Sequence, residues 1–250
     1  MKLVKDILAR FIALWGIISF ILTFLIILIP SLITALFPNP QGMVWFNLLS
    51  RLWMNVWLTL IGCRVKVTGT KNFEQGKNYI VTCNHNALMD VPLSAPFTPA
   101  PNKTIAKDSF TKIPLFGWYY RRGSVLVNRK DAESRKKSYE LMKAALSKGF
   151  NMCIYPEGSR NRTNNPLNNF HDGAFRLAVD TRKPIIPTLI FGTKKTMPVN
   201  KVFYLWPQTL EIHFLKPVEP ENLSITELKE KVFIIMWNYY QQHAKETGKQ

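Results

Sequence analysis

Cysteine and histidine are scarce in this 250-residue sequence, and neither is spaced as a metal or redox site requires. The cysteines are Cys63, Cys83 and Cys153. They form no CxxC pair and are too few for a disulfide framework, so we expect free, mostly buried thiols in a reducing compartment. The histidines are His85, His171, His213 and His243. They are scattered without metal-ligand spacing, and we therefore expect no metal site and no cofactor.

Acidic residues are also few, with 16 Asp and Glu against 33 Lys and Arg and a formal net charge of +17. This excess favours phosphate-rich partners, either anionic lipid or nucleic acid. No recognised nucleic-acid-binding motif is present, and an apolar N-terminal segment favours a lipid surface. The length allows one catalytic domain with membrane-associated helices added to it.

Residues 11–29 carry no charge and have about the length of a helix that spans a bilayer core. A signal peptide is the rival interpretation, but the apolar run is longer than a typical signal core. It is followed by Pro30 and more apolar residues instead of a small-residue cleavage site. Three basic residues precede the run and the next is Arg51, so the charge bias predicts a cytoplasmic N-terminus and a catalytic domain on the cytoplasmic face.

Residues 43–62 are apolar but carry a polar stripe at every fourth position. The stripe consists of Asn47, Arg51, Asn55 and Thr59, and three tryptophans accompany it, Trp45, Trp53 and Trp57. We expect an interfacial helix or a re-entrant partner of the first helix, because tryptophan favours the headgroup level. Alternatively, the stripe packs on the catalytic domain. The predicted division is residues 1–62 for membrane anchoring and 63–250 for catalysis.

From residue 63 onward, short β-rich runs alternate with helix-like stretches, which predicts an α/β domain with a mostly parallel sheet flanked by helices. Strands are expected at 63–69, 79–83, 103–107, 124–129, 152–156 and 184–191, with a closing pair at 201–206 and 209–215. Helices are expected at 131–148, 173–181 and 224–245. Asp131 is a predicted N-cap, and Ser224 with Glu227 has the spacing of a capping box.

The run NHNALMD, residues 84–90, places His85 directly after an apolar strand, where catalytic groups of parallel α/β sheets commonly lie. On one regular helix the five-residue separation from Asp90 would turn the two side chains apart by roughly 140°. They can meet if His85 is in the loop and Asp90 in the first turn of the next helix. The carboxylate could then orient the imidazole and support its positive charge. Cys83 could in principle accept an acyl group, but a buried core thiol is the favoured interpretation.

Four further motifs follow in order: GSVLVNR at 123–129, YPEGSR at 155–160, FHDGAF at 170–175 and PIIP at 184–187. Arg129 lies at the end of an expected strand, a position suited to bidentate contact with phosphate. Two prolines within the last apolar strand indicate an edge, a bulge or a broken ladder. Together with NHNALMD, these motifs resemble the glycerolipid acyltransferase family, and most closely the 1-acylglycerol-3-phosphate acyltransferases, over roughly residues 63–195.

The resemblance implies acyl transfer from a thioester of coenzyme A or acyl carrier protein to a lysophospholipid hydroxyl, with His85 as general base and Asp90 as its partner. It implies that Gly123 and Arg129 bind the acceptor's phosphate. The turn 157–160 would bind the acceptor, and Pro187 belongs to a block associated with the acyl donor or catalysis. The implied substrate-binding residues are Gly123, Arg129, Glu157, Gly158, Ser159, Arg160 and Pro187.

Three positions depart from the family pattern: Asn128 stands for a common Asp, Ser159 for Thr and His171 for Lys. His171 could contact phosphate or be an ordinary core or surface histidine. The expected product is phosphatidic acid from lysophosphatidic acid at an anionic membrane surface. The alternatives are another lysophospholipid or a hydroxylated aminolipid as acceptor, a serine hydrolase, and a non-catalytic lipid-binding protein. A hydrolase is disfavoured because no GxSxG motif is present.

Overall fold

A seven-stranded sheet forms the centre of the computed structural model, which describes residues 2–247 and side chains up to 244. The strand order is β1-β7-β6-β2-β5-β3-β4. The strands are β1 (Arg64–Thr68), β2 (Ile80–Cys83), β3 (Asn102–Lys107), β4 (Ser124–Val127), β5 (Asn151–Ile154), β6 (Ile185–Phe191) and β7 (Thr209–Phe214). Neighbours are parallel except β6 and β7, which confirms the predicted mostly parallel α/β sheet. The outermost residues of the predicted division, 1 and 248–250, lie outside the described residues.

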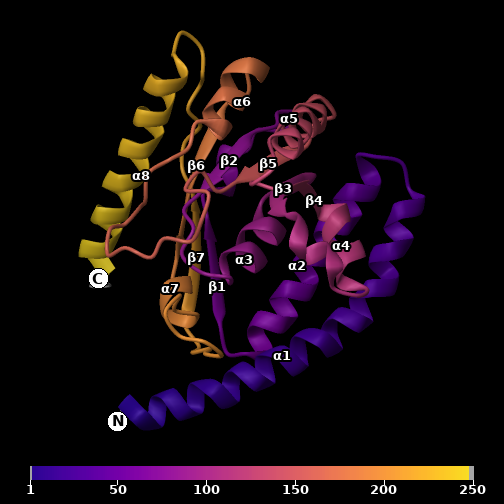
Figure 1. Cartoon of the computed structure of the whole chain (residues 1–250), viewed down its shortest axis with the longest axis vertical. Coiled ribbons are helices and arrows are strands. Elements are labelled where there is room, and N and C mark those ends of the chain that lie inside the picture. The colour runs from indigo at the N-terminus through magenta and orange to yellow at the C-terminus, as the bar shows by residue number, and fades with distance from the viewer. Residues whose placement is uncertain (1, 248–250) are drawn as a thin grey trace.

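Helices cover both faces of this sheet (Figure 1). On one face lie α5 (Ala132–Ser147), α6 (Gly173–Thr181) and α8 (Ile225–Thr247). On the other lie α1 (Lys2–Ile33), α2 (Gln41–Leu60), α3 (Asp90–Phe97) and α4 (Phe116–Gly123). The short helices are η1 (Thr34–Leu36), η2 (Thr70–Asn72), η3 (Asp108–Lys112) and α7 (Thr193–Thr196). Each face has its own apolar core, because both faces of a parallel sheet must be shielded from water.

The predicted helix caps are confirmed. The Asp131 carboxylate accepts the backbone N–H groups of Glu133 and Ser134 at the start of α5. Before α8, the Ser224 hydroxyl accepts from Glu227 N, and the Glu227 carboxylate accepts from the Ser224 backbone. Such caps satisfy amide groups that the first turn of a helix leaves without partners.

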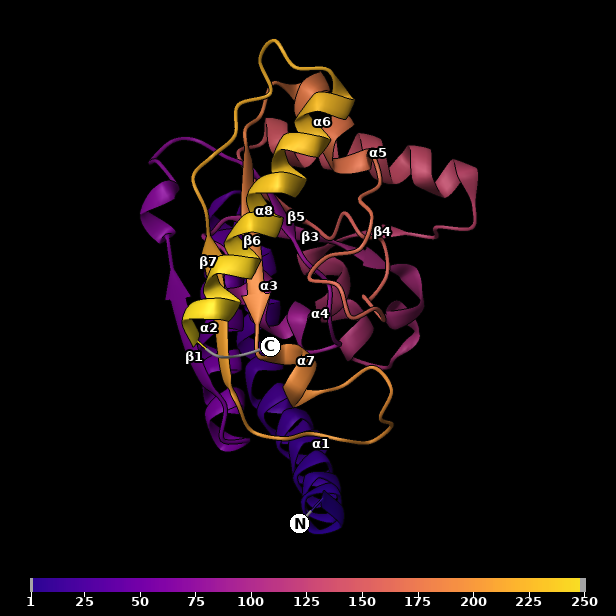
Figure 2. The same ribbon diagram turned by 90° about the vertical axis from the view of Figure 1, so that its left-hand side faces the viewer.

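Helix α1 is packed along the body of the molecule instead of leaving it (Figures 1 and 2). Near its start, Asp6 pairs with Lys201 at 2.6 Å and the Ala9 carbonyl accepts from Leu205 N at 3.2 Å. Further along, the Phe24 ring lies 5.6 Å from the Phe116 ring of α4. By length and composition residues 2–36 could cross a membrane. Only 28% of the most apolar stretch of this helix is buried against the rest of the protein. An apolar face of α1 therefore points away from the protein.

The polar stripe of α2 is divided between two surroundings. Asn47 exchanges hydrogen bonds with the Asn102 backbone, and Arg51 donates to the carbonyls of Pro96 and Thr98. This half packs on the catalytic domain, which was the alternative interpretation, whereas Asn55 and Thr59 are exposed.

The tryptophans of α2 are not all placed as predicted. Trp45 is exposed, but Trp53 and Trp57 are buried, and their indole N–H groups donate to Thr23 and Gly16 of α1. The prediction of a headgroup-level position was therefore wrong for these two residues, because α1 covers them.

The predicted strand at 201–206 does not exist, so the closing pair was wrong in part. Phe203 has a φ of +52°, which interrupts an extended chain. Two backbone N–H groups that follow Phe203 bond elsewhere, Leu205 N to Ala9 O and Trp206 N to Thr196 O. β7 pairs instead with β6 and β1.

The proline-containing strand β6 is central, so the edge interpretation was wrong and the broken ladder is confirmed. Pro187 lies between the regular β6–β7 pairing, which begins at Thr188, and an isolated bridge from Ile185 to Val218. The ladder is interrupted where proline has no N–H to donate. The Pro187 carbonyl still accepts from Leu215 N at 2.9 Å.

Candidate active site

The loop after β2 is fixed to the neighbouring strand by the side chain that precedes His85. The Asn84 amide donates to the Ile190 carbonyl at 3.1 Å and accepts from Ile190 N at 2.7 Å. Asn84 is fully buried, and this paired contact imitates a rung of the β-ladder beyond the end of the strand. His85 therefore leaves the sheet at a defined position.

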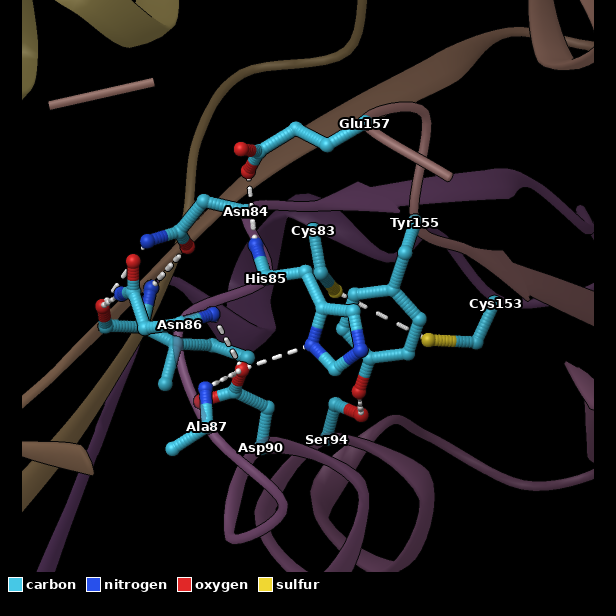
Figure 3. Close-up of polar contacts among 11 residues, drawn as sticks. Cys83, Asn84, His85, Asn86, Ala87, Asp90, Ser94, Cys153, Tyr155 and Glu157 are labelled. Carbon is cyan, nitrogen blue, oxygen red and sulfur yellow. Dashed lines mark hydrogen bonds and ion pairs between the residues drawn. The ribbon is translucent and has the colours of Figure 1, made fainter. Parts of the chain in front are cut away.

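His85 and Asp90 meet as predicted, one in the loop and one at the first residue of α3 (Figure 3). The distance from His85 Nδ1 to Asp90 Oδ2 is 2.8 Å. The same oxygen accepts the backbone N–H groups of Asn86 and Ala87, and Asp90 has no exposed surface. Because an ionised carboxylate only accepts hydrogen bonds, Nδ1 carries a proton toward it and Nε2 presents a lone pair.

The backbone of His85 is held on both sides by the segment that follows β5. Its N–H donates to Glu157 Oε1 at 2.7 Å, and its carbonyl accepts from Asn161 N at 2.6 Å. The other Glu157 oxygen accepts from Asn168 N at 2.9 Å. Glu157 thus joins the loop after β2 to the loop after β5.

Glu157 is only 2% exposed, and burial raises the pKa of its carboxyl to about 7. The two backbone hydrogen bonds act in the opposite direction but do not outweigh the loss of solvation. The Asp90 charge raises this pKa further. The group therefore titrates near neutral pH inside the site.

Tyr155 forms the floor beneath the His85 ring, with ring centroids 4.4 Å apart (Figure 3). Its hydroxyl shares a 2.5 Å hydrogen bond with Ser94 of α3. Burial raises the Tyr155 pKa well above its usual value, so the phenol stays neutral. Among the described residues, no serine hydroxyl is hydrogen-bonded to His85, which gives a serine hydrolase no support.

The turn at 157–160 is shaped by Gly158, whose φ is +69°. A Cβ there would come within 2.7 Å of the His171 ring, so both the backbone and the space require glycine. Ser159 is exposed and Arg160 half-buried. His171 therefore lies beside the turn and is an exposed histidine, although a contact with phosphate stays a prediction.

The remaining predicted site residues lie on other parts of the fold, namely α4, the loop after β4, and β6. Gly123 ends α4, and Arg129 follows β4 as an exposed side chain near Tyr120. Pro187 is buried in the sheet in register with Thr82. The hydrogen bonds described above unite His85, Asp90 and Glu157 but do not extend to these three residues.

Cys83 is a buried thiol, as expected. It has no exposed surface, its Sγ lies 3.7 Å from Cys153 Sγ, and burial raises its pKa well above the usual value. All three cysteines are free and buried. These properties do not suit an acyl-accepting nucleophile, which needs a thiolate that substrate can reach.

Comparison with known families gives a match to the family model described as Acyltransferase over residues 64–191, more than half of the chain. The chain belongs to the acyltransferase family. The match begins at β1 and ends at β6, so it contains the loop of His85 and the turn of Gly158.

Curated members of the acyltransferase family are similar over most of the chain. The 1-acyl-sn-glycerol-3-phosphate acyltransferase of Cocos nucifera is 27% identical over 84% of this chain and 66% of its own length. The enzyme of that name from Saccharomyces cerevisiae is 27% identical, with 82% and 68% covered. The Escherichia coli enzyme is 26% identical, with 68% and 69% covered. The chain thus spans about two thirds of the length of these relatives.

A solved acyltransferase structure shares the fold. The crystal structure of the 1-acyl-sn-glycerophosphate acyltransferase PlsC from Thermotoga maritima superposes with a TM-score of 0.79 at 23% identity, covering 97% of both chains. The coverage includes the N-terminal helices as well as the sheet.

Sequence reasoning missed the supporting residues of this candidate site. Asn84, Tyr155 and Asn161 hold His85 in place. Asn84 and Tyr155 are ordinary polar residues within assigned motifs, and Asn161 directly follows one. Asn84 could have been found from its position, directly after an apolar strand and before His85. A buried amide side chain at such a position needs a hydrogen-bond partner. Nothing in the sequence pointed to Asn161, because only its backbone N–H contacts His85.

Proposed function

We propose that this acyltransferase transfers an acyl group from a coenzyme A or acyl-carrier-protein thioester to the sn-2 hydroxyl of 1-acylglycerol 3-phosphate, giving phosphatidic acid. The observation that carries the proposal is the 2.8 Å contact between His85 Nδ1 and a fully buried Asp90. The names of the relatives, 1-acyl-sn-glycerol-3-phosphate acyltransferases, support lysophosphatidic acid as the acceptor.

His85 acts as the general base. Its Nε2 takes the proton of the acceptor hydroxyl while that oxygen attacks the thioester carbonyl, and Asp90 stabilises the imidazolium that forms. When the tetrahedral intermediate collapses, the C–S bond breaks and the imidazolium returns the proton to the leaving thiolate. No acyl-enzyme and no cofactor is required, and the acyl thioester is a co-substrate.

We assign the acceptor's phosphate to Arg129 and its single acyl chain to the apolar surface beside it. Tyr120 of α4 lies close to Arg129, and its ring is 5.5 Å from Phe110. Exposed apolar side chains continue from there along η3 and α4 toward α1: Phe110, Ile113, Leu115 and Trp118. This arrangement supports an acceptor whose acyl chain stays partly in lipid while its phosphate contacts the Arg129 guanidinium.

The apolar outer face of α1 supports membrane association, and the positive-inside bias supports a catalytic domain on the cytoplasmic face. Since α1 contacts the domain near both of its ends, we propose that it lies in the interface or re-enters instead of crossing away from the domain. The anionic membrane surface and the net charge of +17 attract each other.

The decisive experiment uses the detergent-solubilised full chain with lysophosphatidic acid and an acyl thioester. The wild type should form phosphatidic acid, and His85→Ala should lose about 10³-fold or more in turnover because the hydroxyl has no base. Thermal unfolding serves as the control for folding of the variant. Absence of acyl transfer to any lysolipid by the wild type would refute the proposal.

The alternative acceptor is another lysophospholipid or a hydroxylated aminolipid, and a panel of acceptors separates these. Arg129→Ala should raise KM for phosphate-bearing acceptors by about tenfold or more, with little change for acceptors without phosphate. Arg176→Ala, which changes an exposed arginine of α6, is the matched control. Selectivity of the wild type for an unphosphorylated acceptor would argue against Arg129 as the phosphate ligand.

A further inference from the structure

A second cluster of ionisable side chains lies where β7 meets the end of α8. Glu211 and His213 are alternate residues of β7 and face α8, which contributes His243. Glu211 Oε2 lies 3.3 Å from His213 Nε2 and 3.2 Å from His243 Nε2. The side chains are 7%, 7% and 14% exposed, respectively, so the cluster is largely shielded from water. Figures 1 and 2 show the C-terminal part of α8 beside the part of the sheet that contains β7.

We propose that Glu211, His213 and His243 bind one zinc-class divalent metal ion. Zinc ligands of this kind lie about 2.0–2.2 Å from the ion, which places neighbouring donors in a tetrahedral site about 3.3–3.5 Å apart. The two measured distances to Glu211 Oε2 match this spacing within about 0.1 Å. All donor atoms lie within 4.8 Å of one another, so a small rotation of His243 would complete the set. A water molecule would take the fourth position.

The nitrogen of His213 that faces away from the cluster supports this assignment. Its Nδ1 lies 2.9 Å from the Tyr239 hydroxyl. If Nδ1–H donates to that oxygen, Nε2 presents its lone pair toward Glu211, which is the tautomer that binds metal. Metal-binding histidines commonly have such an outer partner. Tyr239 lies one turn before His243 on α8, so the same helix supplies a ligand and the residue that orients another.

A metal ion accounts for the cluster better than ion pairing alone. One carboxylate oxygen is shared by two imidazoles whose ring centroids are only 4.8 Å apart. Two imidazolium ions at that distance in a shielded position would repel each other more than one carboxylate can offset. A single divalent ion instead uses all three donors with both rings neutral. The imidazole and carboxylate set suits zinc.

The site would act structurally and not in acyl transfer. Its residues contact α8, whereas His85 contacts Asp90 of α3 on the opposite face of the sheet (Figure 1). An ion bridging β7 and α8 would fasten the last helix to the sheet. This proposal replaces our sequence-based expectation of no metal site, and it does not depend on the proposed reaction.

The test is metal binding by the chelator-stripped full chain in detergent, with Zn²⁺ titrated against a chromophoric competitor. We expect one equivalent to bind, a rise in Tm with added Zn²⁺, and a visible absorption spectrum of tetrahedral Co²⁺ when Co²⁺ replaces it. Glu211→Gln and His243→Gln should each weaken Zn²⁺ binding by tenfold or more and remove the Tm shift.

His171→Gln changes an exposed histidine outside the cluster and is the control for nonspecific binding. It should bind Zn²⁺ as the wild type does. If Glu211→Gln fails to fold, His243→Gln still tests the proposal, because the His243 side chain is partly exposed. The proposal is overturned if the wild type binds no Zn²⁺, or if the two cluster variants retain the wild-type affinity and Tm shift.

Discussion

At the scale of single residues, Asp90 offers one oxygen to three donors, the His85 ring and two backbone N–H groups. Asp90→Asn keeps a similar shape but removes the charge that supports the imidazolium. We expect turnover to fall by about 10²–10⁴-fold, with a small change in KM for the acceptor. Steady-state kinetics with lysophosphatidic acid measure both quantities.

Asp180→Asn provides the matched control, because Asp180 is an acidic residue of α6 whose carboxylate contacts only the Tyr139 hydroxyl among the hydrogen bonds described. Its turnover should stay within about twofold of the wild type. Equal losses of turnover in both variants would show that the loss in Asp90→Asn does not come from the contact with His85.

Glu157 predicts a pH dependence of stability. Burial raises its pKa from 4.5 to about 7, so its contribution to the free energy of unfolding is complete below pH 4.5 and is lost as pH rises through 7. Glu157→Gln cannot titrate. The free energy of unfolding of the wild type minus that of the variant should therefore fall between pH 4.5 and 8, by on the order of 3 kcal/mol at most.

Denaturant unfolding of both proteins at several pH values measures this difference, and the subtraction removes groups common to the two. A difference that stays constant with pH, or rises with it, would contradict the assignment of this pKa to Glu157.

The sequence predicted the contact between His85 and Asp90 but not the residues that hold His85 in place. His85 and Asp90 could be paired because a strand end and a helix start are local features that a single sequence displays. Glu157, in contrast, contacts backbone groups of residues 72 and 11 positions away. The position of a backbone N–H depends on how the loops fold, and it cannot be inferred from the residue types in the sequence.

At the scale of elements, α1 exposes a continuous apolar surface that includes Ile26, 74% exposed, and Ile29, 65% exposed. The double variant Ile26→Glu, Ile29→Glu should lower binding to lipid vesicles by about tenfold or more, because burial of each isoleucine is lost and two charges must be kept in water. Vesicle sedimentation measures the bound fraction.

Leu141→Glu is the matched control, because Leu141 is an exposed apolar residue of α5 on the opposite side of the sheet. Its vesicle binding should equal that of the wild type. Similar losses in both proteins would indicate a general effect of added negative charge, and unchanged binding of the α1 variant would refute the assignment of α1 to the membrane.

Elements with local signals were predicted well, and those decided by distant contacts were not. The strands from β1 to β6 and the caps of α5 and α8 carry their signals within a few residues. Segment 201–206 has the composition of a strand, but its N–H groups bond to α1 and to Thr196, which no local pattern reveals. Trp53 and Trp57 were misplaced for the same reason, since α1 covers them.

At the scale of the whole molecule, the fold class could be predicted because β-rich and helical stretches alternate, and parallel strands need helical connections. The strand order could not, since many orders satisfy the same pattern. Helix α2 is buried between α1 and the sheet, so deletion of α1 would disturb the packing of the protein as well as its membrane binding. Removal of residues 1–42 would uncover Trp53 and Trp57, so point substitutions on the outer face of α1 test membrane binding more cleanly.

The order of the sheet also determines when the protein can fold during synthesis. β1 pairs in the sheet with β7, whose first residue is 145 positions after the first residue of β1. The start of α1 likewise contacts Lys201 and Leu205. While the ribosome is still making the middle of the chain, these C-terminal partners of α1 and β1 have not been synthesised. Helix α1 therefore lacks these contacts until nearly the whole polypeptide has emerged. Until then its apolar surface needs another cover, either lipid or a chaperone.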